Sequence, residues 1–241
     1  MRQYGKLCTI IYDLDKKFAS PDEINFYTSF VNTPQAKILE PMCGSGRFYI
    51  PLLKAGYNIT GFDASPAMLA ACRKRCKAYN LTPHLFRADI IQFQDRQQYD
   101  YIIIPIGSVS LIIDEEDLLH CLENMRVSLS KNGEFIFSIL NPGSPTEDIN
   151  EWQEKMRYLL DDKEIICKQK MHYLPEQSLL DIKLLYELRQ EGNLLEQEYQ
   201  DFPIRLYTQD IINQLLQQAG FSEVSTKTWT NQFTVFCCKA I

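Results

Sequence analysis

Short apolar runs alternate with helical patterns of apolar residues between residue 36 and about residue 140. The five apolar runs are typical of strands bounded by turn residues, and they cover residues 36–40, 58–62, 83–87, 100–104 and 133–139. Between them, apolar spacing and end signals predict helices over about 46–56, 66–79 and 114–130. Strand–helix alternation with short connections predicts a doubly wound, parallel sheet.

After residue 141 this alternation gives way to a run of strands. Residues 152–160 have the apolar spacing of a helix. Three longer segments with short turns then predict antiparallel strands, over 164–174, 179–190 and 193–207. We therefore predict an antiparallel layer inserted over residues 143–207.

The chain closes with one more helix and two strands. Thr208 starts the helical segment TQDIINQLLQQAGF, and Gly220 ends it. Two last strands, over about 222–229 and 232–239, predict a tight antiparallel pair. The fold class is therefore α/β, a single domain over residues 1–241 with a doubly wound, seven-stranded, mostly parallel sheet and an inserted antiparallel β layer.

Composition and charge narrow the classes of partner. The chain has 241 residues, of which 45% are hydrophobic, so it can bury a sizeable core. Its net charge of −6 disfavours general binding to nucleic acid or to anionic membranes, and the basic run RKRCK (73–77) is interpreted as a solvated helix face. Oligomeric state is left open.

The N-terminus and the cysteines indicate location. The opening residues MRQYGKLCTIIYDLDKKFAS lack a long apolar stretch, so we expect this segment to be neither a signal peptide nor a membrane span. The eight cysteines follow no framework spacing, so we expect free thiols in a reducing cytoplasm. Cys72 and Cys76 lie one helical turn apart, but without a second ligand pair we expect no metal site.

A glycine loop follows the first predicted strand, in the sequence EPMCGSGR. Gly44 and Gly46 allow a tight turn in which a ligand approaches the backbone. A third glycine of the dinucleotide fingerprint would fall at residue 49, where this chain has Tyr49. No Gly-Lys-Ser/Thr follows, so the loop is not a phosphate-binding P-loop either.

Three acids lie at the ends of successive predicted strands. Asp63 is placed to accept both ribose hydroxyl hydrogens. Asp89, in FRAD, is placed to accept from an adenine amine. Glu40 precedes the glycine loop, where its charge would repel a diphosphate and attract an ammonium and a sulfonium. Together they describe a site for adenosine joined to a cationic amino acid.

These motifs resemble those of class I S-adenosylmethionine (SAM)-dependent methyltransferases of the small-molecule type. The likeness rests on five segments in the family's order, namely ILEPMCGSGR, GFDASPAMLAACR, RADI, DYIIIPIGSVSLI and RLYTQDIINQLLQQAGF. Met42 stands where the family commonly has a glycine. The resemblance implies the Rossmann-like methyltransferase fold, SAM as cofactor and a small-molecule methyl acceptor.

The resemblance also implies roles for particular residues. Glu40, Met42 and Gly44 would contact the methionine part of SAM, and Asp63 the ribose. The remaining implied cofactor contacts are Ala64 and Met68 at the adenine edge, Asp89 and Ile90 at its polar rim, and Ile106 and Gly107 beside the methionine side. Helix packing is an equal alternative for Met68. Arg47 is left open between a carboxylate partner and a solvated residue.

In similar enzymes an N-terminal segment closes over the cofactor. Residues 1–35 are therefore expected to be a helical lid, with Tyr12 as the candidate residue over the cofactor; helix packing is the alternative for Tyr12. The inserted layer is expected to cover the acceptor, with candidate contacts at Tyr173, Tyr186, Arg205 and Tyr207, although tyrosines also pack amphipathic strands.

The catalytic residues are not identified by the sequence. The reactive methyl belongs to the cofactor, so the protein mainly has to place a nucleophile in line and exclude water. An oxygen nucleophile usually needs a base, whereas a neutral amine does not. If a catalytic group is used, the candidates for it are His172 and Tyr12.

We interpret the chain as a SAM-dependent methyltransferase that acts on nitrogen or oxygen of a small molecule. Two alternatives stay open. A SAM-binding protein without turnover would carry the same binding motifs. An NAD-dependent oxidoreductase is disfavoured by the missing third glycine and by Glu40.

Overall fold

A seven-stranded sheet forms the body of the protein in the computed structural model, which describes residues 4–96, 98–141, 143 and 148–240. Its strands are β1 (Ile38–Pro41), β2 (Ile59–Asp63), β3 (His84–Arg87), β4 (Tyr99–Ile104), β5 (Leu129–Leu140), β11 (Phe221–Trp229) and β12 (Phe233–Ala240). They lie in the order β11-β12-β5-β4-β1-β2-β3, and only the pairs made by β12 are antiparallel. The predicted sheet is confirmed. β3 is an edge strand, and His84 at its start is exposed.

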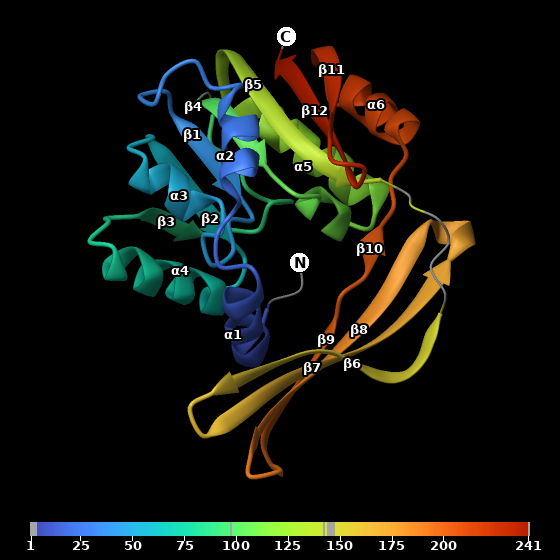
Figure 1. Cartoon of the computed structure of the whole chain (residues 1–241). Coiled ribbons are helices and arrows are strands. Elements are labelled where there is room, and N and C mark those ends of the chain that lie inside the picture. The colour runs from blue at the N-terminus through green and yellow to red at the C-terminus, as the bar shows by residue number, and fades with distance from the viewer. Residues whose placement is uncertain (1–3, 97, 142, 144–147, 241) are drawn as a thin grey trace.

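Helices cover both faces of this sheet (Figure 1). They are α2 (Pro21–Thr28), α3 (Tyr49–Lys54) and α4 (Pro66–Ala78) on one face, and α5 (Glu115–Ser128) and α6 (Gln209–Gln218) on the other. Alternate residues of a strand point to opposite sides of the sheet. Because helices cover both sides, the central strands are apolar on both faces. In β4, Ile102 and Ile104 pack with α5 and α6, whereas Tyr101 and Ile103 pack against the other face.

End signals in the sequence set most helix boundaries. The Ser65 hydroxyl accepts from the Met68 N–H at the start of α4, and the Thr208 hydroxyl accepts from Ile211 at the start of α6. Helix α3 starts at Tyr49, three residues later than predicted, because the glycine loop occupies the residues before it. No helix among the described residues is long and apolar enough to cross a membrane.

A second, antiparallel sheet is inserted between β5 and α6. Its strands are β6 (Ile149–Leu160), β7 (Lys163–Leu174), β8 (Leu179–Gln190), β9 (Asn193–Asp201) and β10 (Ile204–Arg205). The predicted antiparallel layer is confirmed, but the predicted helix over 152–160 is wrong because this segment is strand β6. Residues 156, 158 and 160 fit a strand of period two as well as a helix, and pairing with β7 decides the outcome.

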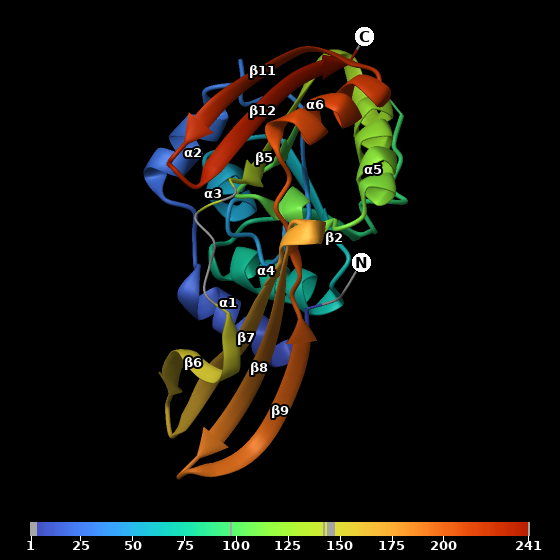
Figure 2. The ribbon, with the colours of Figure 1, turned by 90° about the vertical axis from the view of Figure 1, so that its right-hand side faces the viewer.

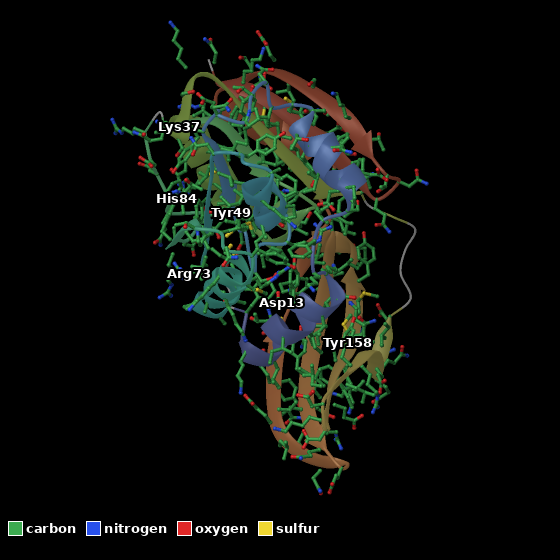
Figure 3. The ribbon with its side chains drawn as sticks, turned by 60° about the vertical axis from the view of Figure 1, so that its left-hand side comes forward. Asp13, Lys37, Tyr49, Arg73, His84 and Tyr158 are labelled. Atoms are coloured by element: carbon green, nitrogen blue, oxygen red, sulfur yellow. The ribbon has the colours of Figure 1, made fainter. Side chains whose placement is uncertain are left out.

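Helix α1 (Lys6–Asp15) packs on this second sheet, so segments far apart in sequence share a third core (Figures 1 and 2). The Glu198 carboxylate of β9 accepts hydrogen bonds from the backbone N–H groups of Leu7 (2.9 Å) and Cys8 (3.1 Å) at the start of α1. A Cβ on Gly5 would lie 2.3 Å from the Glu198 carboxyl carbon. Glycine at this position therefore permits the contact that fixes α1. Figure 3 shows Asp13 of α1 and Tyr158 of β6 on facing elements.

Candidate active site

A cavity of about 510 Å³ lies at the carboxyl ends of β1 and β4. The N-terminal segment through the start of α2, the end of β5, the start of β12 and the end of the inserted layer also enclose it. Its lining includes Tyr12 and Glu23 from the N-terminal segment, Glu40 at the end of β1, Met42 and Arg47 after β1, Ile106 and Gly107 after β4, and Phe202, Ile204 and Phe233. Open α/β sheets bind ligands at this edge.

The glycine loop that forms one wall has three residues in the left-handed backbone region. Met42 has φ 57°, Gly44 φ 55° and Gly46 φ 87°. A Cβ on Gly46 would lie 2.5 Å from the sulfur of Cys72, so helix α4 and the loop pack directly together. Met42 adopts a conformation that costs a residue with a side chain about 1–2 kcal/mol, which explains why similar loops commonly have glycine there.

Asp63 ties this loop to helix α4. Its carboxylate accepts from the Gly44 N–H (2.9 Å) and from the Ser65 N–H (2.8 Å), and the residue is 7% exposed. Burial raises the pKa of Asp63, and the two backbone donors oppose that rise. A carboxylate has about four lone-pair sites, so the group can accept two more hydrogen bonds from a ribose diol.

Glu40 brings a buried carboxyl group to the cavity wall. It is 3% exposed, and among the described residues its Oε2 atom has no hydrogen-bond partner. Burial raises the pKa of Glu40 well above its ordinary value, while nearby Arg47 lowers it. A buried unpaired acid of this kind is stabilised by a cationic ligand.

Arg47 lies beside Glu40 and is paired. Its guanidinium donates to both carboxylate oxygens of Glu23 in α2, through Nη1 to Oε1 (2.7 Å) and through Nη2 to Oε2. Glu23 is 3% exposed, so Arg47 is not the solvated residue that the sequence left open. The cavity wall thus presents carboxylates and a guanidinium, the groups that match the ammonium and carboxylate of an amino acid.

A smaller cavity of about 190 Å³ adjoins the first one and is mostly apolar. Ile91, Leu111 and Ile112 line it, with Asp114 and Asp117 at its edge. It lies beside Asp89, whose carboxylate accepts from the Ile91 N–H (3.0 Å). An apolar slot with acceptors at its rim fits a purine ring.

Tyr4 separates the two cavities and lines both. Its carbonyl accepts from the Ser65 hydroxyl (2.9 Å), and its ring meets Phe202 edge to face at 6.0 Å. Burial raises the pKa of the Tyr4 phenol well above its usual value, with Tyr12 and Asp63 among the nearby groups. Sequence reasoning missed Tyr4. The only available signal was an aromatic residue in the expected lid.

The predicted cofactor residues fall into two groups. Tyr12, Glu40, Met42, Ile106 and Gly107 line the larger cavity, and burial raises the pKa of Tyr12 to about 12. The others lie outside the lining of either cavity, namely Gly44, Asp63, Ala64, Met68, Asp89 and Ile90. Among these, Met68 and Ile90 are each 1% exposed, so their side chains support the site from within the core.

The residues predicted for the acceptor line neither cavity, and of the two catalytic candidates only Tyr12 lines one, whereas His172 does not. Tyr186 is 3% exposed in the core under α1, and Tyr207 is fully buried with its hydroxyl donating to Ile112 O at 2.7 Å. Arg205 pairs with Glu115 at 2.9 Å, and His172 lies 3.5 Å from Asp148. Together with Tyr173, these described residues line neither cavity.

The acceptor assignment stays a prediction, which these positions do not support. Alternate strand residues point to opposite faces, and the face of β8 with Tyr186 packs inward, whereas Tyr207 follows β10 and is buried in the core beside Ile112. Phe202 and Ile204 line the cavity instead, between β9 and the end of β10. The sequence signal for Phe202 and Ile204 was the segment DFPI (201–204), which directly precedes the predicted residues Arg205 and Tyr207.

Comparison with known proteins agrees with this geometry. Residues 38–133 match the family model of the methyltransferase domain. A protein of Geobacillus sp. (strain WCH70) named as a methyltransferase is 22% identical over 186 residues, which cover 77% of this chain and 74% of that one.

Two solved structures are similar along the whole chain. The sugar N-methyltransferase KedS8 from Streptoalloteichus sp. ATCC 53650 has a TM-score of 0.79 at 18% identity, covering 100% of this chain and 95% of that one. CalS10, an amino pentose methyltransferase from Micromonospora echinaspora solved with SAM bound, has a TM-score of 0.72 at 14% identity, covering 100% and 99%. At these identities the likeness shows the fold.

The domain match, the glycine loop with acids at three strand ends, and the strand order all agree. Residues 38–133 match a methyltransferase domain, and the whole chain has the fold of the solved methyltransferases KedS8 and CalS10.

Proposed function

We propose that this protein transfers the methyl group of SAM to an amino group of a small molecule, with an oxygen acceptor as the alternative. The observation that carries the proposal is the buried Glu40 carboxyl group at the wall of the larger cavity, whose Oε2 atom has no hydrogen-bond partner among the described residues. SAM brings an ammonium and a sulfonium, whereas NAD would bring two phosphate charges that this acid repels.

Particular residues fit the parts of SAM. Glu40 would hold the ammonium, and Arg47, already paired with Glu23, would hold the carboxylate of the methionine part. Asp63 would accept from the ribose hydroxyls, and the apolar cavity at Ile91 and Leu111 would take the adenine. When bound, SAM supplies an electrophilic methyl group.

The protein's own contribution to transfer is placement and exclusion of water. Phe202, Ile204 and Phe233 form an apolar wall opposite the glycine loop. Such a wall removes solvent from the nucleophile and restricts its approach to one direction. The segments expected as a lid (1–35) and as a covering layer (143–207) both contribute residues to this cavity, which supports those roles.

Two observations favour nitrogen over oxygen. The described residues that line the larger cavity include no histidine, the commonest general base, which fits an amine acceptor better than a hydroxyl. The structural neighbours KedS8 and CalS10 are named for sugar N-methylation and for methylation of an amino pentose.

The free state of all eight cysteines supports a reducing, cytoplasmic setting.

Titration calorimetry with S-adenosylhomocysteine (SAH) and with NAD tests the cofactor. A product assay with SAM and the matched acceptors glucosamine and glucose, followed by wider panels of amines and alcohols, tests the transfer. Binding of SAH with methylation of amines alone supports the proposal. Methylation of alcohols alone would favour the oxygen alternative, binding without any transfer would favour a binding protein, and tight NAD binding without SAH binding would overturn it.

A further inference from the structure

The turn after β4 has two successive residues in the left-handed backbone region. Ile106 has φ 51° and Gly107 has φ 67°, and both line the larger cavity. For a β-branched residue such as Ile106 this conformation is a strained one. Strained residues persist only where their surroundings hold them, and they concentrate at functional sites.

Two buried hydroxyl groups hold this turn from behind. The Ile106 N–H donates to the Tyr27 hydroxyl (3.3 Å), and the Gly107 N–H donates to the Ser138 hydroxyl (2.7 Å). The Tyr27 hydroxyl in turn donates to the Ser138 oxygen (3.1 Å). Both residues are fully buried, and burial raises the pKa of Tyr27 to about 12, so the phenol keeps its proton.

The network fixes the direction of a carbonyl group. In a planar trans peptide the C=O points opposite to the N–H. Because the Gly107 N–H points to Ser138 in the sheet, the Ile106 carbonyl points away from the sheet, on the side of the cavity that Ile106 and Gly107 line. A Cβ on Gly107 would lie 3.0 Å from the Phe233 ring, which leaves the turn little room to relax.

Sheet order would place this carbonyl beside the methyl group of a bound SAM. A sulfonium has three substituents, and strands β2 and β3 supply the adenosine acids Asp63 and Asp89 while β1 supplies Glu40 for the amino acid. The remaining neighbour of β1 is β4. The third substituent, which is the methyl group, then faces the turn after β4.

We propose that Tyr27 and Ser138 are positioning residues for methyl transfer, which hold the Ile106 carbonyl against the methyl and the incoming amine. This inference rests on the proposed function. The carbonyl accepts an N–H of the amine, which directs the nitrogen lone pair at the methyl carbon. Tyr27 belongs to α2, so the N-terminal segment contributes to the transfer geometry as well as to the cavity wall.

The test compares two cofactor analogues and needs no acceptor. SAH lacks the methyl group, whereas sinefungin carries an amino group at the methyl position, where it would donate to the Ile106 carbonyl. The variants are Tyr27→Phe and Ser138→Ala. Tyr49→Phe is the matched control, because Tyr49 is equally buried and its hydroxyl bonds the backbone of Ile59 and His84 at the amino ends of β2 and β3 (Figure 3).

We expect Tyr27→Phe and Ser138→Ala to weaken sinefungin binding about tenfold relative to SAH, since hydrogen bonds to charged groups are the stronger ones. Tyr49→Phe should lower the melting temperature about as much as Tyr27→Phe does. It should leave the ratio of the sinefungin and SAH dissociation constants unchanged. A purely structural role would move melting temperature and not this ratio.

The outcomes separate this inference from the proposed function. Wild-type protein that binds neither analogue would overturn the proposed function and this inference with it. Wild-type binding of both, with an unchanged ratio in Tyr27→Phe, would overturn the positioning role alone. If Ser138→Ala proves too unstable to measure, Tyr27→Phe decides, because it keeps the ring that packs against Phe48.

Discussion

Replacement of Glu40 by glutamine should change stability and cofactor affinity in opposite directions. The change keeps the size of a side chain that is 3% exposed and removes a charge whose Oε2 atom has no partner among the described residues. Burial raises the pKa of Glu40, so ionisation of this acid costs free energy, about 1.4 kcal/mol for each pKa unit of the rise. We therefore expect Glu40→Gln to stabilise the ligand-free protein by about 1 kcal/mol at neutral pH.

The same change should weaken SAM binding. Two unit charges about 4 Å apart attract by about 1–4 kcal/mol between the dielectric of water and that of a protein surface. The midpoint of that range corresponds to a loss of affinity of roughly 50-fold. Titration calorimetry with SAM and thermal denaturation without ligand, on the same preparations, measure both effects.

The raised pKa of Glu40 adds a pH dependence with a definite sign. Between its ordinary value of 4.5 and its raised folded-state value, the folded protein binds more protons than the unfolded chain. Stability of the ligand-free protein should therefore fall as pH rises through this window, and Glu40→Gln should abolish that part of the slope. SAM affinity should rise through the same window, because the cation binds the ionised acid.

Two results would refute this reasoning. If Glu40→Gln bound SAM as tightly as the wild type, the ammonium and sulfonium could not lie beside this carboxylate. If the variant were less stable at neutral pH than the wild type, the Glu40 charge would have compensating partners, and the site would already be electrostatically balanced without a ligand.

The other predictions concern the rest of the site. Asp63→Asn places an N–H against a backbone N–H of Gly44 or Ser65, so SAH affinity should fall about 30- to 150-fold and stability should fall as well; unchanged calorimetric affinity would remove Asp63 from the ribose site. Phe202→Ala should raise the acceptor KM about tenfold through lost apolar contact, while Arg205→Ala should leave it within about twofold because that residue is outside the cavity; steady-state kinetics in which Arg205→Ala has the larger effect would contradict this. Tyr207→Phe should cost about 1–2 kcal/mol of unfolding free energy by denaturant titration, since it leaves a buried carbonyl unpaired, and should not alter kcat.

The parallel sheet could be predicted from the sequence because each of its strands and helices carries its own local signal. Ser65 and Thr208 mark helix starts, and the strands are apolar on both faces. The first part of the site was predictable for the same reason, since the ends of β1, β2 and β3 are fixed once the strands are known. Glu40 and Met42 accordingly line the larger cavity.

The inserted layer was less predictable because its side chains are assigned to a face by distant partners. Residues 152–160 fit a helix and a strand equally well until β7 is placed beside them. Tyr186 is directed inward by α1, which comes from the opposite end of the chain. Tyr4 could not be singled out either, because its place between the two cavities depends on contacts with Ser65 and Phe202.

The clamp between Glu198 and the start of α1 has a mechanical consequence. Helix α1 and the antiparallel sheet approach the cavity from opposite ends of the chain, yet they share one core and two backbone-to-carboxylate hydrogen bonds. We therefore expect helix α1 and the antiparallel sheet to move together, as one unit, when a ligand enters. Hydrogen exchange on SAH binding should slow in both segments together, whereas Gly5→Ala, which forces Glu198 aside, should let α1 exchange faster than β9.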